Sequence, residues 1–245
     1  MIAVLAGEVP PFFMEDKEGR LFGLDIELAG DLAAQLGLGI EYNREATTYD
    51  DVVRIIFEGK ADIAISNLSR TLKRSQMVRF SEPYIILYQT VLINRLKAAQ
   101  ERPKGESQNN LNQPHVKIST LADSSYMDFA RESFPLATVV PYSDSSLAVQ
   151  DVLAGKNHAF IFDNIFAKNW HFNNPDGALY LQTMIMKENE DQISFAVNWK
   201  DTHLLAWLEH YLKNIKANGF LKGLTEKYMD DHTWRERWQP LKENQ

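Results

Sequence analysis

The chain has 245 residues, of which 44% are hydrophobic and 24% are charged, and its formal net charge at pH 7 is −7. This length can hold one large domain or two small ones, each able to bury a core. The acidic balance and the lack of a basic block argue against binding to nucleic acid or to an anionic membrane surface. The absence of cysteine excludes disulfides, thiolate catalysis and cysteine-based zinc sites.

No apolar run approaches the roughly 18 residues that a membrane span requires. The first residues, MIAVLAGEVPPFF, lack the basic start and the apolar length of a signal peptide. We therefore expect that, if the protein is exported, its targeting segment has been removed and Met1 is an added start residue.

The first part of the chain alternates short apolar segments with segments whose apolar residues recur at helical spacing. We expect strands at Ile2–Ala6, Ile40–Asn43 and Ile63–Ser66, and helices at Leu24–Gly37 and Tyr49–Glu58. Strand–helix–strand–helix–strand within so few residues predicts a parallel sheet with helical crossovers.

A polar loop follows the third of these strands. Ser66, Asn67, Ser69 and Thr71 bring hydroxyls and an amide together, and Arg74 follows where a tight turn would bring it back over them. Backbone N–H groups, hydroxyls and one guanidinium can together hold a small carboxylate. A polar loop with a surface arginine is the alternative interpretation.

The middle of the chain contains a long apolar strand, Ile85–Asn94, and then Arg95–His115, a polar stretch that we expect to be a mobile surface loop. A second cycle follows, with strands at Val116–Ile118, Ala137–Val140 and His158–Phe162 and helices at Ser124–Arg131 and Ser145–Ala154. The repeated order predicts two similar α/β lobes, with ligands bound beyond the carboxyl ends of the strands.

The last part is expected to contain a strand at Ile193–Val197 and helices at Asp201–Asn218 and Phe220–Met229. The chain, which leaves the first lobe along the strand at Ile85–Asn94, is then expected to cross back to it near residues 184–192. Trp234 and Trp238, in the tail, are expected to pack against the first lobe, or else to contact a partner or a following domain.

Polar residues also follow strands in the second half of the chain. Ser124 and Ser125 stand at a strand-to-helix turn, where free N–H groups suit an anion. Asp163 stands at a strand end that corresponds to Ser66 in the first half. An ordinary helix N-cap is the alternative for each of these positions.

Two motifs resemble a known family. Residues 62–74 read D-x-x-x-S-x-x-S-x-T-x-x-R, and residues 80–84 read F-S-x-P-Y. Together they resemble the bacterial extracellular solute-binding proteins of family 3, the polar amino-acid-binding components of ABC importers. The similarity extends from about Ile2 to about Met229.

The resemblance implies an α/β fold with two lobes, the type II periplasmic-binding-protein-like fold. Each lobe is then a mainly parallel sheet flanked by helices, and the chain crosses twice between the lobes. Lobe one comprises residues 1–93 and 192–245, and lobe two comprises residues 94–191.

The same resemblance implies a ligand site in which the first lobe and the serines of the second hold a carboxylate, while an aspartate accepts the α-ammonium. Arg74 takes the carboxylate, Asp163 takes the ammonium and Tyr49 stacks on the ligand's side chain. The expected ligand-binding residues are Val9, Phe12, Tyr49, Ser66, Asn67, Ser69, Thr71, Arg74, Ser124, Ser125, Tyr126 and Asp163.

The chain departs from the family pattern near the first strand. Relatives often carry an acidic residue at the position of Ala6 and an aromatic one at Val9. A basic ligand side chain is therefore less expected than a polar uncharged or apolar one, although Glu8 is a partial substitute.

The expected function is binding of an amino-acid-like solute by a periplasmic or extracellular monomer. Closure of the cleft on binding then presents the ligand to the membrane permease of an ABC importer. We expect no catalytic residue, cofactor or metal, because catalytic motifs are missing and the six histidines show no metal-binding spacing. Two alternatives stay open: a ligand-sensing extracellular domain of a membrane signalling protein, and a cyclohexadienyl-dehydratase-like enzyme using Glu8 or Asp163.

Overall fold

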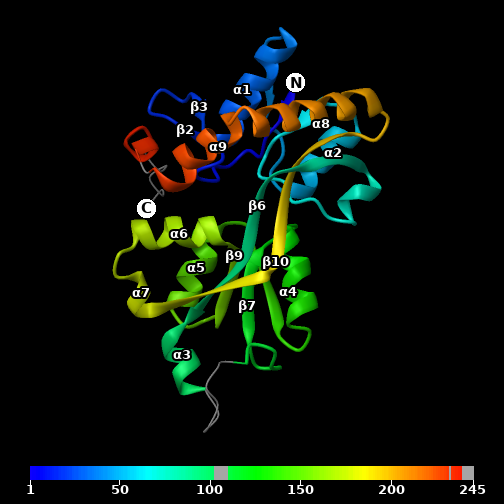
Figure 1. The fold of residues 1–245 in the computed structure, drawn as a ribbon. Helices are drawn as coiled ribbons and strands as arrows, with labels where there is room; N and C mark the ends of the chain where they lie inside the picture. The colour runs from blue at the N-terminus through cyan, green and yellow to red at the C-terminus, as the bar shows by residue number, and fades with distance from the viewer. Residues whose placement is uncertain (102–109, 232, 239–245) are drawn as a thin grey trace. The chain divides into compact units, whose positions relative to one another are not determined.

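The computed structural model describes residues 1–101, 110–231 and 233–238. The chain divides into two compact units, Met1–Ile85 with Gln192–Gln245 and Ile86–Asp191. Two long strands, β6 (Val78–Asn94) and β10 (Leu181–Asn198), each contain a border between the units (Figure 1). The lobe borders expected at residues 93 and 192 stay a prediction.

The first unit contains a short parallel sheet with one antiparallel strand. In it, β1 (Ile2–Ala3) lies parallel to β4 (Tyr42–Asn43) and β5 (Ile63–Ala64). The end of β10 pairs antiparallel with β5, Val197 opposite Ile63. The predicted parallel arrangement is confirmed, although these strands are shorter than expected.

Among its described residues, this unit contains four α-helices: α1 (Leu24–Leu36), α2 (Tyr49–Phe57), α8 (Thr202–Ala217) and α9 (Phe220–Thr225). Gly37 ends α1 in the left-handed conformation, with φ at 67°, as the sequence predicted. The helix expected at Phe220–Met229 is α-helical only as far as Thr225, and a π turn at Glu226–Asp230 follows.

A small hairpin and the C-terminal segment also belong to the first unit. The hairpin consists of β2 (Met14–Glu15) and β3 (Leu21–Phe22), which the sequence did not predict. Trp234, in a 3₁₀ turn at Thr233–Glu236, is buried, and the next residues bridge to the hairpin through Asp16. The tryptophans of the tail therefore pack within the first unit, as expected.

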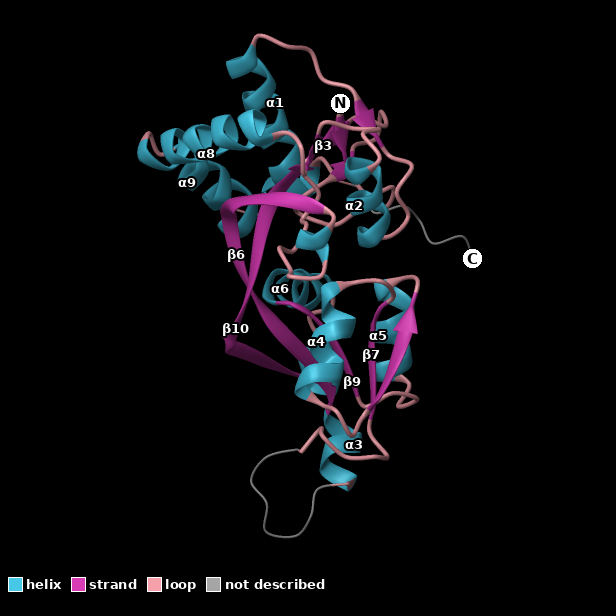
Figure 2. Cartoon of the chain, turned by 90° about the vertical axis from the view of Figure 1, so that its right-hand side faces the viewer, coloured by secondary structure: helices cyan, strands magenta, loops and turns pink. Residues whose placement is uncertain are grey.

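The second unit is a mainly parallel sheet with helices on both of its faces (Figure 1, Figure 2). Its central strand β7 (Lys117–Leu121) lies parallel to β8 (Thr138–Tyr142) and β9 (Ala159–Asp163), and β6 pairs antiparallel with β9. Helices α4 (Ser125–Ser133) and α5 (Ser145–Leu153) pack against these strands (Figure 2). The buried side chains between the sheet and these helices form the core of this unit.

Three helices of the second unit were not predicted. Residues 95–100, expected to be loop, form α3 (Arg95–Gln100), whose first turn Asn94 caps by accepting the Lys97 N–H at 2.9 Å. The remainder of that expected loop at 102–109 lies outside the described residues. The other two, α6 (Asn164–Asn173) and α7 (Gly177–Tyr180), precede β10. Every helix in the described part of the chain is too short or too polar to cross a membrane.

Candidate functional site

The polar loop after β5 is buried and tightly held. The Ser66 hydroxyl accepts the Leu5 N–H at 2.9 Å, and Ser69 forms a β-bridge with Ile193. Asn67 has a φ of 45° and is 2% exposed, and its amide oxygen and nitrogen have no hydrogen-bond partner among the described residues. The loop therefore keeps a buried amide whose hydrogen-bonding capacity the described residues do not satisfy, which calls for an explanation such as a bound ligand or water.

Arg74 lies in a 3₁₀ turn at Arg74–Gln76 and is only 4% exposed, so the interpretation as a surface arginine is wrong. Its N–H donates to the Thr71 hydroxyl at 3.2 Å, which confirms the tight turn. Its Nη1 donates to the Ser69 carbonyl at 3.2 Å and its Nε to Asp50 Oδ1 at 3.1 Å. These contacts fix the guanidinium beside the loop.

The first turn of α2 supplies two neighbours of Arg74. Tyr49 is buried, and the Arg74 Cζ lies 5.8 Å from the centroid of its ring, which is within cation–π range. Asp50 pairs with Arg74 and with Lys73. We did not predict Asp50; an acidic residue directly after the expected ligand-stacking tyrosine was the available signal.

Val9 and Phe12 form a turn in which the Phe12 N–H donates to the Val9 carbonyl at 2.8 Å. Phe12 is buried, and α1 begins against its backbone. Gly23, with φ at 133°, permits this approach, because a Cβ there would overlap the Phe12 carbonyl oxygen. Glu8 accepts the Glu15 N–H at 2.7 Å and the Trp238 indole N–H at 3.3 Å, so both of its oxygens are engaged.

Asp163 ends β9 and starts α6 in the second unit, where it is 1% exposed. One carboxylate oxygen caps the helix by accepting the Phe166 N–H at 2.7 Å, and the other accepts the Tyr126 hydroxyl at 3.2 Å. Burial raises the pKa of Asp163 to about 6. The N-cap interpretation is therefore correct, and the same carboxylate can still accept a further donor.

Three buried polar residues of the second unit were not predicted. Gln89 lies opposite Asp163 in the β6–β9 ladder, and Thr120 lies in β7. Both are buried, and Gln89 Oε1 and Thr120 Oγ1 have no hydrogen-bond partner among the described residues. Asp191, also buried, adds to the rise in the Asp163 pKa. Nothing in their local sequence distinguishes these residues, and for Gln89 it is strand pairing that sets it opposite Asp163.

Ser124 and Ser125 lie at the start of α4. The Ser124 hydroxyl donates to the Leu121 carbonyl at 2.7 Å and does not cap the helix, while Ser125 is half-buried. Asp123, just before them, has a φ of 50°. The two serines stand at the N-terminus of a helix of nine residues, where N–H groups favour an anion.

The two units therefore carry complementary chemistry. The first supplies a guanidinium, hydroxyls and an aromatic ring from Arg74, Ser69 and Tyr49. The second supplies a buried carboxylate from Asp163. A zwitterion needs a cationic site rich in hydrogen-bond donors for its carboxylate and an anionic site for its ammonium. We call Arg74 and the loop around Ser69 the carboxylate seat and Asp163 the ammonium seat.

A separate cluster contains Glu101, His115 and His158, whose ligand atoms lie within 4.8 Å of one another. His158 Nδ1 accepts the Lys117 N–H at 2.9 Å, so a neutral His158 carries its proton on Nε2, which lies 3.0 Å from Glu101 Oε2. That nitrogen has no lone pair for a metal ion, and the Lys97 ammonium lies 3.4 Å from it. The group is better described as a hydrogen-bonded ion cluster than as a metal site.

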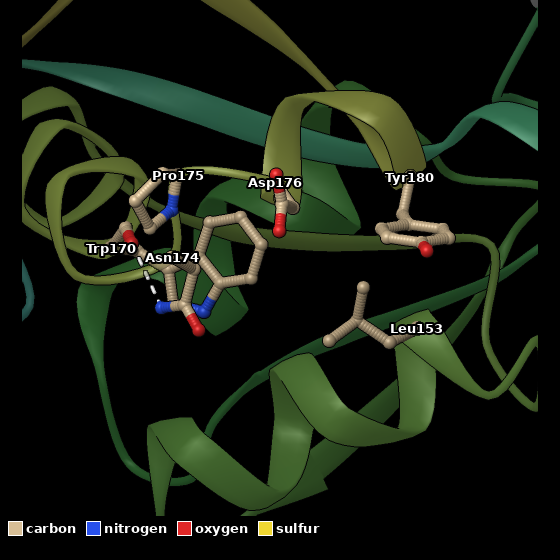
Figure 3. Close-up of a pocket in the computed structure, with 7 residues that line it drawn as sticks. Leu153, Trp170, Asn174, Pro175, Asp176 and Tyr180 are labelled. Carbon is tan, nitrogen blue, oxygen red and sulfur yellow. Dashed lines mark hydrogen bonds between the residues drawn. The ribbon is translucent and has the colours of Figure 1, made fainter.

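A cavity of about 260 Å³ lies in the second unit, away from the expected site residues. It is lined by Leu153, Trp170, Asn174, Pro175, Asp176, Gly177 and Tyr180. Figure 3 shows Trp170 and Tyr180 on either side of Asp176. None of the predicted ligand-binding residues lines it.

The chain is similar to known binding proteins over nearly its whole length. A crystal structure of a putative binding component of an ABC transporter from Wolinella succinogenes, complexed with lysine, is 30% identical, with a TM-score of 0.82 and coverage of 96% of this chain and 98% of that one. The L-cystine-binding protein TcyJ of Escherichia coli K12 is 23% identical over 233 residues, covering 93% of this chain and 82% of its own. The cyclohexadienyl dehydratase of Pseudomonas aeruginosa is 25% identical over 162 residues, which is 66% of this chain and 58% of the enzyme.

These similarities confirm the predicted fold, the two-lobed α/β fold of type II periplasmic binding proteins. The model of one family, described as bacterial extracellular solute-binding proteins, family 3, matches residues 1–231. The chain belongs to this family of bacterial extracellular solute-binding proteins.

Proposed function

We propose that the protein binds an amino acid outside the cytoplasm and delivers it to the membrane permease of an ABC importer. The observation that carries this proposal is the complementary pair of seats, a buried Arg74 in one unit and a buried Asp163 in the other. In the proposed complex, Arg74 and the loop around Ser69 hold the carboxylate, and Asp163 accepts the α-ammonium. The ligand then makes all of its polar contacts only when both units engage it, which couples binding to closure.

We further propose that the ligand has a polar uncharged or apolar side chain. A basic side chain needs a carboxylate beyond the one that holds its α-ammonium. Glu8 is engaged by the Glu15 N–H and by Trp238, and Asp50 is paired with Arg74 and Lys73. Val9, Phe12 and Tyr49 are apolar or aromatic instead, Val9 being half-buried and the other two buried.

The protein is proposed to act by binding alone, as a monomer. The dehydratase alternative has weaker support, since the similarity to the Pseudomonas enzyme covers 66% of this chain. Incubation with prephenate or arogenate tests it directly, because loss of substrate would establish catalysis. Asp163→Asn is the matching variant, since it removes the acid or base that such chemistry needs.

The test of the binding proposal is a thermal-shift screen of refolded, ligand-free protein against the twenty L-amino acids and L-cystine. A ligand at 100 times its dissociation constant adds about 2.7 kcal/mol to the free energy of unfolding. For a chain of this size the melting temperature then rises by roughly 5–10 °C. A rise with one or a few amino acids supports the proposal, and the absence of any rise contradicts it.

A further inference from the structure

One buried carboxylate in the first unit has no place in the proposed ligand contacts. Asp25 lies in the first turn of α1 and is fully buried. Its Oδ2 accepts the backbone N–H of Asn67 at 2.6 Å, and its Oδ1 accepts the Tyr84 hydroxyl at 2.8 Å. One side chain thus connects the loop after β5 to the strand β6.

Both connected positions are informative. Asn67 holds a left-handed φ of 45°, which non-glycine residues adopt uncommonly, and it sits between Ser66 and Ser69 of the proposed carboxylate seat. A bond to its N–H therefore fixes the direction in which this loop presents its donors. Tyr84 immediately precedes Ile85, the last residue of the first unit before the chain enters the second.

We propose that Asp25 is a positioning residue of the ligand site, whose ionised carboxylate holds the Asn67 turn and ties it, through Tyr84, to the strand that leads into the second unit. This inference rests on the proposed function. Asp25 itself does not contact the ligand.

The protonation state of Asp25 should control how firmly the Asn67 turn is held. Two donors, the Asn67 N–H and the Tyr84 O–H, each bond one of its oxygens, so protonation replaces a charged acceptor by a neutral one and weakens the hold on the Asn67 turn. Burial raises the pKa of Asp25 to about 7, while both hydrogen bonds lower it. The Tyr84 hydroxyl faces Asp25 from β6, and the Asn67 backbone N–H faces it from the loop. Burial, Asp25 and, to a smaller extent, Tyr49 of α2 raise the pKa of Tyr84. Ligand affinity should therefore fall as the pH falls through about 7.

The experiment follows the Asn67 amide by NMR on ¹⁵N-labelled protein between pH 5.5 and 8.5. In parallel, a mixture of the twenty L-amino acids is added to the protein in steps up to 1 mM each. The melting temperature is measured at each step and each pH, which gives the affinity for the mixture. In the wild type, the Asn67 amide shift should titrate with a midpoint near 7. The affinity at pH 8 should fall at least tenfold in Asp25→Asn, and its pH step near 7 should disappear.

Tyr84→Phe gives a second, signed readout in a variant that keeps the ring. Its hydroxyl lowers the Asp25 pKa, so its removal should move the midpoint of the Asn67 titration to higher pH. The matched controls are Asp31→Asn and Tyr211→Phe. These residues form another tyrosine–aspartate bond, at 2.8 Å, that joins α8 to α1 and not α1 to the loop, so the Asn67 titration and the affinity should stay unchanged.

The inference is overturned if Asp25→Asn binds the mixture with wild-type affinity and pH profile, or if the Asn67 amide does not titrate in the wild type. If Asp25→Asn does not fold, the Tyr84→Phe midpoint decides. A wild type that no amino acid in the mixture stabilises contradicts the proposed function instead, and the Asn67 titration still decides whether Asp25 holds the turn.

Discussion

Arg74→Ala tests the proposed carboxylate seat most directly. The guanidinium is 4% exposed, so water screens its charge little. Its removal also takes one partner from Asp50, but Asp50 keeps its ion pair with Lys73, and its side chain is 36% exposed and can regain water. Most of the loss should therefore fall on the ligand's carboxylate, which is left without its charged partner.

Leaving a buried charge unpaired costs about 3–5 kcal/mol. Because about 1.4 kcal/mol corresponds to a tenfold change, the dissociation constant should rise by about 100- to 4,000-fold. Isothermal titration calorimetry with the amino acid that gives the largest thermal shift measures this change. Arg70→Ala is the matched control, since Arg70 lies in the same loop with its side chain 38% exposed and contacts Ser81 and Glu82.

The control variant should bind within about threefold of the wild type, as expected for a surface ion pair. An Arg74→Ala variant that is folded and binds within tenfold of the wild type would refute the assignment of Arg74 to the carboxylate. Equal losses in both arginine variants would refute it too, because the effect would then follow from net charge and not from the seat.

Three further changes have defined outcomes. Asp163→Asn should weaken binding by about 2–5 kcal/mol in calorimetry, since an amide cannot neutralise an ammonium. The affinity of the wild type should decline as the pH falls through about 6, the pKa of Asp163. An affinity that stays constant across that pH range argues against the assignment of Asp163 to the ammonium. Burial lowers the pKa of His158, so the folded state resists its protonation and stability should fall as the pH drops below the ordinary histidine value of 6.5. His158→Asn, which keeps an acceptor for the Lys117 N–H, should remove that part of the pH dependence in urea unfolding, and an unchanged profile would show that another group causes it. Gly23→Ala should destabilise the protein by about 3 kcal/mol or more, because the added Cβ overlaps the Phe12 carbonyl and the backbone conformation is strained. The control is Gly30→Ala, which has open space at Cβ and should be neutral or stabilising by up to about 1 kcal/mol. Similar melting temperatures for the two variants would contradict the role of Gly23.

Local pattern was enough for much of the fold. Helix α1 and its end at Gly37, and the start of α2 at Tyr49, follow from apolar spacing and from turn chemistry that neighbouring residues carry. The errors fall where that information is weak. Helix α3 buries none of its residues, so no apolar face marked it in the sequence.

The candidate site divides in the same way. The turn at Arg74 was predicted because Thr71, its partner, is three residues away. The partners Asp50 of Arg74 and Gln89 of Asp163 are far apart in the chain from the residues they accompany, and only tertiary packing and strand pairing bring them near. Single-sequence reasoning therefore reached the residues with a local pattern and missed those that support them.

The order of the strands also has a consequence for how the chain acquires its structure. The second unit is one continuous segment, Ile86–Asp191, whereas the first is completed only by residues from Gln192 onward. Until those residues emerge from the ribosome, β5 lacks its antiparallel neighbour β10 and presents an open edge. The inserted unit should therefore fold first during synthesis, and chains cut off near residue 191 should retain it while their N-terminal half aggregates.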